Sequence, residues 1–236
     1  MIPVLTVSGV SKAFRLHLHG GTHLPVVEGV DFAVHAGECV VLGGPSGAGK
    51  SSILKAIYGN YIANSGSIML HDGKETVDVA RALPGEIIEL RSRTMGYVSQ
   101  FLRVIPRVPA LEIVAEAARA SGLPADEARV RAATLLAHLN LPERLWSLPP
   151  ATFSGGEQQR VNIARGFAGT HRFLILDEPT ASLDAVNREA VIALIEARKA
   201  QGAAFLGIFH DLDVRDRVAD RIIDVTQFSP KPELAA

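Results

Sequence analysis

Residues 44–52 read Gly-Pro-Ser-Gly-Ala-Gly-Lys-Ser-Ser and match the pattern G-x-x-x-x-G-K-[ST] in full. Glycines in this pattern let backbone N–H groups curl around a polyphosphate, and the following helix N-terminus adds partial positive charge. Lys50 would reach the β- and γ-phosphates, and the Ser51 hydroxyl would ligate Mg²⁺. The segment therefore predicts a nucleotide-binding loop. The residues expected to contact the nucleotide are Gly44, Pro45, Ser46, Gly47, Ala48, Gly49, Lys50, Ser51 and Ser52.

Two acidic residues, Asp177 and Glu178, follow the apolar run at 173–176. Such a run is typical of a parallel strand buried on both faces, and ligands of open α/β sheets bind at the carboxyl ends of the strands. We expect Asp177 to hold the magnesium shell, directly or through water, and Glu178 to polarise an attacking water. The pair predicts hydrolysis of the bound nucleotide.

A second segment with phosphate-binding character begins at Ser154. Ser154 can N-cap the next helix, and Gly155 and Gly156 leave its first turn bare. Helix N-termini bind anions, so the chain carries a second anion-binding helix start beside its phosphate loop. Upstream of the loop, the aromatic ring of Phe14 could stack on an adenine, although a core position is equally consistent with the sequence.

The elements that would position these residues form an α/β fold. Residues 38–42 predict a buried strand before the loop and 52–58 a helix after it. Strands and helices alternate over the last third, which indicates a parallel sheet, whereas the first forty residues and 67–79 read as antiparallel strands. Helical periodicity spans 110–139. We expect one domain over 1–228, with 1–100 and 165–228 forming the core and its antiparallel β subdomain, 101–164 an inserted helical subdomain, and 229–236 a flexible tail.

Composition limits the remaining possibilities. The chain of 236 residues has one cysteine, Cys39, so it has no internal disulfide and a reducing cytoplasm is the expected compartment. Its formal net charge of -1 does not indicate a nucleic-acid partner. No apolar stretch has the length of a membrane-spanning helix, so we expect no direct membrane insertion.

Six motifs in order resemble the ATPase domain of ATP-binding cassette (ABC) proteins, over nearly the whole chain. Two positions depart from the usual pattern: Phe153 stands where leucine begins the signature, and Glu157 where glutamine often closes it. The resemblance implies ATP and Mg²⁺ as cofactors. It also implies a head-to-tail dimer, with itself or a homologous subunit, in which the signature of one protomer completes the ATP site of the other. The motifs are the phosphate loop, Gln100, 154–158 (the signature), 176–179, 181–184 and His210.

The same resemblance implies further roles for individual residues. Gln100 would contact magnesium and the attacking water, and His210 would hold the γ-phosphate and Glu178 in line. Asp184 lies in a loop that would communicate between the two ATP sites. Of the signature, Ser154, Gly155, Gly156 and Glu157 would contact the partner's nucleotide.

Four segments resemble a narrower group, the L subunits of bacterial carbon–phosphorus lyase systems: 98–107, 141–146, 158–167 and 207–211. That resemblance implies an ATPase that assists the conversion of ATP and methylphosphonate to ribose 1-methylphosphonate 5-triphosphate and adenine. Its partners would be the G, H and I subunits and the wider complex with J and K. Two alternatives stay open: the ATPase subunit of a membrane transporter, and an ATP-gated clamp without catalysis. Glu178 and His210 argue against the clamp.

Overall fold

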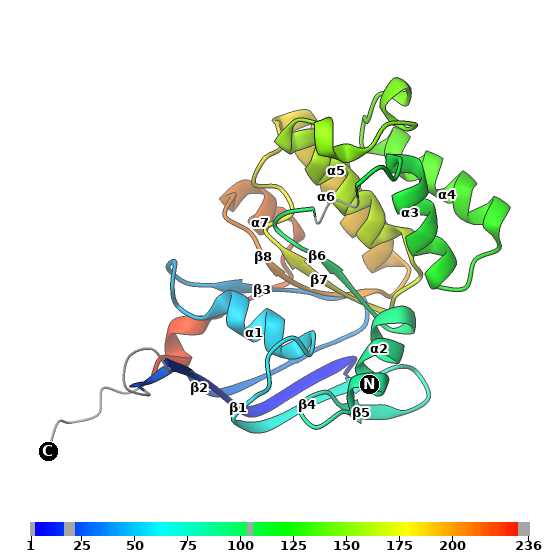
Figure 1. The fold of residues 1–236 in the computed structure, drawn as a ribbon. Coiled ribbons are helices and arrows are strands. Elements are labelled where there is room, and N and C mark those ends of the chain that lie inside the picture. Colours follow the sequence, from blue (N-terminus) through cyan, green and yellow to red (C-terminus); the bar gives the residue numbers. More distant parts are fainter. Residues whose placement is uncertain (1–2, 17–21, 103–105, 231–236) are drawn as a thin grey trace, which may run out of the picture.

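Two sheets form the framework of the protein in a computed structural model that describes residues 3–16, 22–102 and 106–230 (Figure 1). One sheet is antiparallel, with the strand order β2-β1-β4-β5, and the other is parallel, with the order β6-β7-β8-β3-β9. The predicted α/β fold with an antiparallel β subdomain is confirmed. The strands are β1 (Leu5–Leu16), β2 (Thr22–Val34), β3 (Cys39–Gly43), β4 (Ser65–His71), β5 (Thr76–Asp78), β6 (Met95–Val98), β7 (Phe173–Asp177), β8 (Ala204–Ile208) and β9 (Arg221–Asp224).

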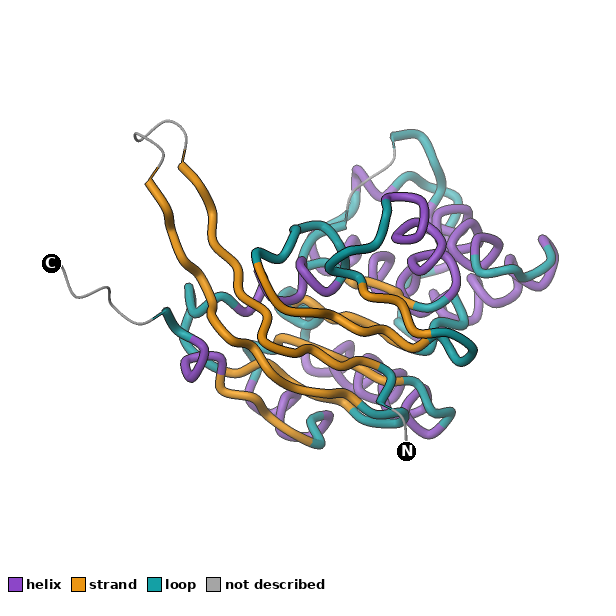
Figure 2. Tube along the Cα trace, turned by 90° about the horizontal axis from the view of Figure 1, so that it is seen from below, coloured by secondary structure: helices purple, strands orange, loops and turns teal. Residues whose placement is uncertain are grey.

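The helices divide into a central one and an outer set. Helix α1 (Lys50–Ile57) lies between the two sheets (Figure 1), and Figure 2 shows the long paired strands β1 and β2 of the antiparallel sheet from below. The others are α2 (Pro84–Arg93), α3 (Ala110–Ala120), α4 (Ala125–His138), α5 (Gly155–Ala168), α6 (Ala185–Ala200) and α7 (Leu212–Val218), with short 3-10 turns at η2 (Glu143–Leu145), η3 (Pro150–Thr152) and η4 (Val225–Phe228). In the outer set, α2 packs against the space between the sheets through Ile87 and Leu90, α5, α6 and α7 cover the opposite face of the parallel sheet, and α3 and α4 form a separate helical block.

Two apolar clusters hold these layers together. One fills the space between the sheets and includes Leu54 of α1, Leu5 of β1 and Leu206 of β8, each 0% exposed. The other lies on the far face of the parallel sheet, where the rings of Phe167 and Phe205 stack with centroids 6.1 Å apart. Because α1 is packed from both sides, its N-terminus holds the preceding loop in a fixed position.

The carboxyl ends of three neighbouring parallel strands bring the predicted chemistry to one edge of the sheet. Strand β3 leads into the phosphate loop, β7 ends at Asp177, and β8 ends just before His210. Within the described ranges, no helix combines the length and apolarity needed to cross a membrane. The predicted tail over 229–236 lies mostly outside the described residues, as do Arg103, Val104 and Ile105 of the segment 98–107.

Candidate nucleotide site

The phosphate loop is shaped by glycines with positive φ. Gly44, Gly47 and Gly49 have φ values of 121°, 84° and 97°. At Gly49 an added Cβ would lie 2.5 Å from Cγ1 of Val27, so a larger residue would clash with β2 as well as strain the backbone. Among the described residues, no side chain caps the N-terminus of α1. Its first N–H groups are therefore available to an anion.

Lys50 is buried in this loop and only 9% exposed. Its Nζ donates to the carbonyl oxygens of Gly44 at 2.8 Å and Pro45 at 2.7 Å. These two hydrogen bonds hold the ammonium group over the loop. A buried cation beside a bare helix N-terminus is a strong attraction for phosphate oxygens.

The loop lines a cavity of about 300 Å³, which is also lined by Glu178 after the end of β7 and His210 after the end of β8. The cavity fits a polyphosphate, because it combines Lys50, the free helix start and the hydroxyls of Ser51 and Ser52. Hydroxyl and carboxylate oxygens, here from Ser51 and Asp177, suit Mg²⁺, which is commonly held by few protein ligands together with substrate phosphates. The described residues contain no group of three or more His, Cys, Asp or Glu side chains that could hold a metal ion. The lining residues are Val26, Ser46, Gly47, Gly49, Lys50, Ser51, Ser52, Glu178 and His210.

Asp177 is held by a residue that the sequence analysis missed. The carboxylate is 7% exposed, and its Oδ2 accepts a hydrogen bond of 2.7 Å from the Tyr97 hydroxyl. Burial, and then this bond to Asp177, raise the pKa of Tyr97 above its ordinary value of 10.0, so the hydroxyl stays protonated and donates. Tyr97 lies on β6 and Asp177 on the adjacent β7, so the pair is formed by strand order.

Glu178, Gln100 and His210 meet in space. Nε2 of His210 lies 2.8 Å from Oε1 of Glu178, and Nε2 of Gln100 donates to Oε2 at 3.0 Å. Glu178 also has a left-handed backbone with φ of 52°, a conformation that costs free energy for a non-glycine residue and is common at functional sites. Each carboxylate oxygen keeps a second lone pair, so Glu178 can hold both contacts and still accept a hydrogen bond from water.

The signature residues lie apart from this cavity and form the start of α5. Ser154 Oγ accepts from the Glu157 N–H at 3.4 Å, while the Ser154 N–H and Oγ each donate to Oε2 of Glu157 at 2.8 Å. These hydrogen bonds to Ser154 lower the pKa of Glu157 below its ordinary value of 4.5. Glu157 thus closes a reciprocal capping box, which glutamine could also form. Gly155 and Gly156 keep the first turn bare, and a Cβ on Gly156 would come within 3.0 Å of the Ser182 carbonyl oxygen.

Two other predicted site residues have structural contacts. Asp184 caps α6, where its Oδ1 accepts from the N–H and the side-chain amide of Asn187, both at 2.9 Å. The Phe14 ring packs edge-on against Tyr61 at 5.2 Å, with Lys12 Nζ 4.7 Å from its centroid. Phe14 is not among the residues that line the phosphate cavity. Adenine stacking by Phe14 stays a prediction.

Comparison with known proteins connects this geometry to a family. The family model described as ABC transporter matches residues 27–181. Among relatives, the lipoprotein-releasing system ATP-binding protein LolD of Idiomarina loihiensis is 35% identical over 216 residues and is covered to 91%, as is this chain. The macrolide export ATP-binding/permease protein MacB of Brucella melitensis is 37% identical over 94% of this chain, which spans only 33% of that relative's length.

Solved structures agree with the fold. The dimeric structure of MJ0796, a bacterial ABC transporter cassette, aligns with a TM-score of 0.84 at 26% identity and covers 94% of this chain and 95% of its own. A structure of that cassette in a post-hydrolysis state was solved with ADP and Pi bound. The chain therefore belongs to the family of ATP-binding cassette ATPases, which bind ATP with Mg²⁺.

Proposed function

We propose that this chain hydrolyses ATP between two cassettes arranged head to tail, and that it transmits the resulting movement to a partner. One observation carries the hydrolytic part: Glu178 lies between Gln100 and His210 on the cavity that holds Lys50. An acid held by two donors beside a phosphate-binding loop is suited to accept a proton from an attacking water.

In this proposal the nucleotide is held by the loop. The N–H groups at the start of α1 and Lys50 Nζ bind the β- and γ-phosphates. Ser51 and Asp177 would hold Mg²⁺, with Gln100 joining through its amide oxygen, because its amide nitrogen already contacts Glu178. The bound ion would neutralise phosphate charge. His210 would keep Glu178 and the γ-phosphate in line.

The second cassette supplies what the cavity of one chain lacks. None of the described residues 154–157 lines the phosphate cavity, although the helix start that they form suits an anion. Relatives with the same fold form dimers, as MJ0796 does. The signature of one protomer would therefore face the γ-phosphate on the other.

For the partner, the comparisons favour the permease of a membrane transporter. The relatives are named as a lipoprotein-releasing system ATP-binding protein and a macrolide export ATP-binding/permease protein. The permease part of the macrolide export protein would lie in the portion of its length that this chain does not span. In a transporter, this chain would supply the ATPase at the cytoplasmic face.

A carbon–phosphorus lyase system is the second candidate, favoured by the four sequence segments that resemble its L subunits. Here the chain would assist a ribose 1-methylphosphonate 5-triphosphate synthase, a transferase of phosphonate metabolism, together with the G, H, I, J and K subunits. Adenine release requires cleavage of the glycosidic bond, whereas the candidate catalytic residues Gln100, Glu178 and His210 all address the γ-phosphate. The partners would have to supply that chemistry. A clamp without catalysis is disfavoured by the contacts of Glu178.

Product analysis separates these functions. We expect the isolated chain to convert ATP to ADP and phosphate, with or without methylphosphonate, and Glu178→Gln to abolish this activity. If the phosphonate system is the partner, chromatography should detect adenine once the G, H and I subunits and methylphosphonate are added, and much less with Glu178→Gln. If the same amount of adenine forms with and without this chain, the transporter is favoured. The direct test of the transporter is stimulation of ATP hydrolysis by a permease in proteoliposomes. ATP bound but not hydrolysed under all these conditions would refute the proposed ATPase.

A further inference from the structure

The Tyr97 hydroxyl is well placed to control the candidate magnesium ligand. Strands β6 and β7 run parallel, with Tyr97 opposite Ile175 and Val98 opposite Leu176. The hydroxyl reaches Oδ2 of Asp177 at 2.7 Å, at the end of β7 where the carboxylate is almost fully buried. A carboxylate held through one oxygen cannot rotate freely, so its other oxygen keeps a defined direction.

The Tyr97 ring is itself held by its neighbours. It packs on the Tyr58 ring with centroids 4.8 Å apart, and the Arg91 guanidinium lies 4.2 Å from the Tyr58 centroid. Arg91 also donates two hydrogen bonds to the Tyr58 carbonyl oxygen, at 3.1 and 2.7 Å. We call Arg91, Tyr58 and Tyr97 the aromatic stack. Tyr58 is the C-cap residue of α1, the helix that follows the phosphate loop. The stack therefore joins this helix to the edge of the parallel sheet that carries Asp177, the candidate magnesium ligand.

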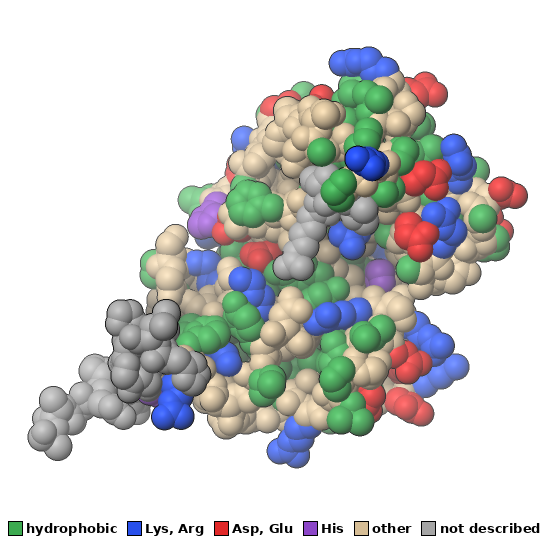
Figure 3. All heavy atoms as spheres, in the orientation of Figure 1, with side chains coloured by type: hydrophobic (Ala, Val, Ile, Leu, Met, Phe, Trp, Pro, Cys, Tyr) green, Lys and Arg blue, Asp and Glu red, His purple; other side chains and the backbone are tan. Residues whose placement is uncertain are grey.

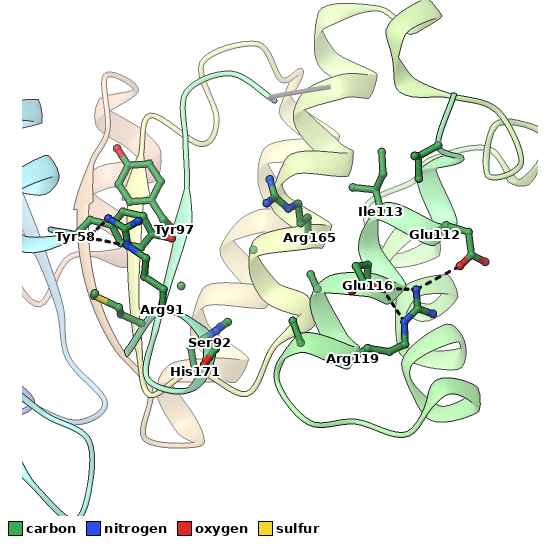
Figure 4. Close-up of a pocket in the computed structure, with 16 residues that line it drawn as sticks. Tyr58, Arg91, Ser92, Tyr97, Glu112, Ile113, Glu116, Arg119, Arg165 and His171 are labelled. Atoms are coloured by element: carbon green, nitrogen blue, oxygen red, sulfur yellow. Dashed lines mark hydrogen bonds and ion pairs between the residues drawn. The ribbon is translucent and has the colours of Figure 1, made fainter. Parts of the chain in front are cut away.

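The aromatic stack forms one wall of a second cavity, of about 430 Å³, between the sheet and the helical block (Figure 4). On the opposite wall, Glu116 and Arg119 of α3 form an ion pair at 2.7 Å. On the surface, basic and apolar side chains lie together where the helical block meets the core (Figure 3). This cavity leaves one side of the stack without packing contacts, so the position of Tyr97 relies in part on Tyr58, which Arg91 supports.

We propose that Tyr97 is a positioning residue that orients Asp177 for Mg²⁺, and that Tyr58 and Arg91 hold it in place. This inference rests on the proposed function, in which Asp177 holds the ion. The alternative is that the hydroxyl bond only stabilises the fold. The two roles differ in what they change: positioning acts on the gain in ATP affinity that Mg²⁺ provides, whereas a purely structural bond changes thermal stability and leaves that gain unaltered.

The test uses Tyr97→Phe, which removes one hydroxyl and keeps the ring. Tyr58→Phe is its matched control, because it removes a hydroxyl from the same stack that is not the donor to Asp177. Calorimetry on the full chain gives the dissociation constant of ATP with Mg²⁺ and with EDTA. We expect Tyr97→Phe to reduce the Mg²⁺-dependent gain about tenfold, since it loses a hydrogen bond to a charged group. Affinity in EDTA and the behaviour of Tyr58→Phe should match the wild type.

Arg91→Ala tests the support of the ring. It should reduce the Mg²⁺-dependent gain in the wild type and have no further effect in Tyr97→Phe, because both changes act through the same contact. Thermal unfolding of every variant establishes that it is folded. A wild-type gain retained in Tyr97→Phe, with or without a lower unfolding temperature, would overturn the inference alone. A wild type without any Mg²⁺-dependent gain would instead remove the proposed magnesium site and the inference with it.

Discussion

The role of Ser154 can be tested by separating its two effects, on the fold and on assembly. The perturbation is Ser154→Ala combined with Glu178→Gln, which should bind ATP without hydrolysing it and so preserve any dimer. Ser154 is exposed, and its Oγ contacts only Glu157 among the hydrogen bonds of the described residues. Loss of a serine N-cap costs about 1 kcal/mol of folding free energy. For a domain of this size that lowers the unfolding temperature by about 2–4 °C.

The effect on assembly should be much larger. In a symmetric dimer Ser154 acts twice, once at each γ-phosphate. Each lost hydrogen bond to a charged group is worth about 1.5–3 kcal/mol, so the dimer loses about 3 kcal/mol or more. This weakens dimerisation by roughly a hundredfold or more. The signature change should therefore abolish the dimer under conditions where the fold survives.

Light scattering with Mg²⁺-ATP and with EDTA measures the outcome. Glu178→Gln alone should be dimeric with ATP and monomeric without it, and the double variant should be monomeric in both. Ser154→Thr is the control, because it keeps a hydroxyl at an exposed position and can still cap the helix. If Ser154→Ala dimerises as strongly as its parent while losing the expected stability, Ser154 caps α5 and does not contact phosphate. A single mass for Glu178→Gln, regardless of nucleotide, would refute the dimer of identical chains.

Three further experiments test the loop, the capping box and the core. Lys50→Ala should abolish Mg²⁺-ATP binding in calorimetry, because it removes the buried ammonium group of the loop; near-normal affinity would refute the site. The pKa of Glu157 in the folded chain is lowered below its ordinary value of 4.5. The charged side chain therefore stabilises the fold at pH values above 4.5, and this stabilisation is lost as the pH falls through the folded pKa. The difference in unfolding free energy between the wild type and Glu157→Gln should therefore shrink on acidification from about pH 6 to about pH 3, and a constant difference would contradict the assignment. Phe205→Ala should cost about 3–5 kcal/mol in urea unfolding, whereas Phe101→Ala, at a position 72% exposed, should cost less than about 0.5 kcal/mol.

The parts of the candidate site that can be predicted from the sequence are those determined locally. The loop around Lys50 is specified by glycine positions, and Asp177 by its place after an apolar strand. Both patterns depend on neighbouring residues in the chain, so they can be recognised without knowing the fold. The contact of His210 with Glu178 is implied by the family resemblance, since nothing in the spacing indicates it. The resemblance places Gln100 on magnesium and the attacking water, and it does not imply the hydrogen bond from Gln100 to Glu178.

Contacts between distant segments could not be predicted in this way. Tyr97 and Asp177 are 80 residues apart and meet only because β6 and β7 are adjacent. Phe14 was considered as an adenine platform or a core residue, and neither alternative included its edge-on contact with Tyr61. Strand order and the path of the chain after α1 decide these neighbours. The domain boundaries stay predictions, and the one at 164 falls within α5.

The N-termini of α1 and α5 differ in how many of their N–H groups are already satisfied, and this difference predicts the order of nucleotide binding and dimer formation. At α5, Ser154 and Glu157 satisfy part of the helix N-terminus within the chain. At α1 none of the described side chains does so, and Lys50 adds positive charge beside these N–H groups. The α1 site therefore gains more from an anion, because its donors have no competing protein acceptor. We expect nucleotide to bind first at α1 of a single chain, and the signature helix of a second cassette to close on the phosphates afterwards.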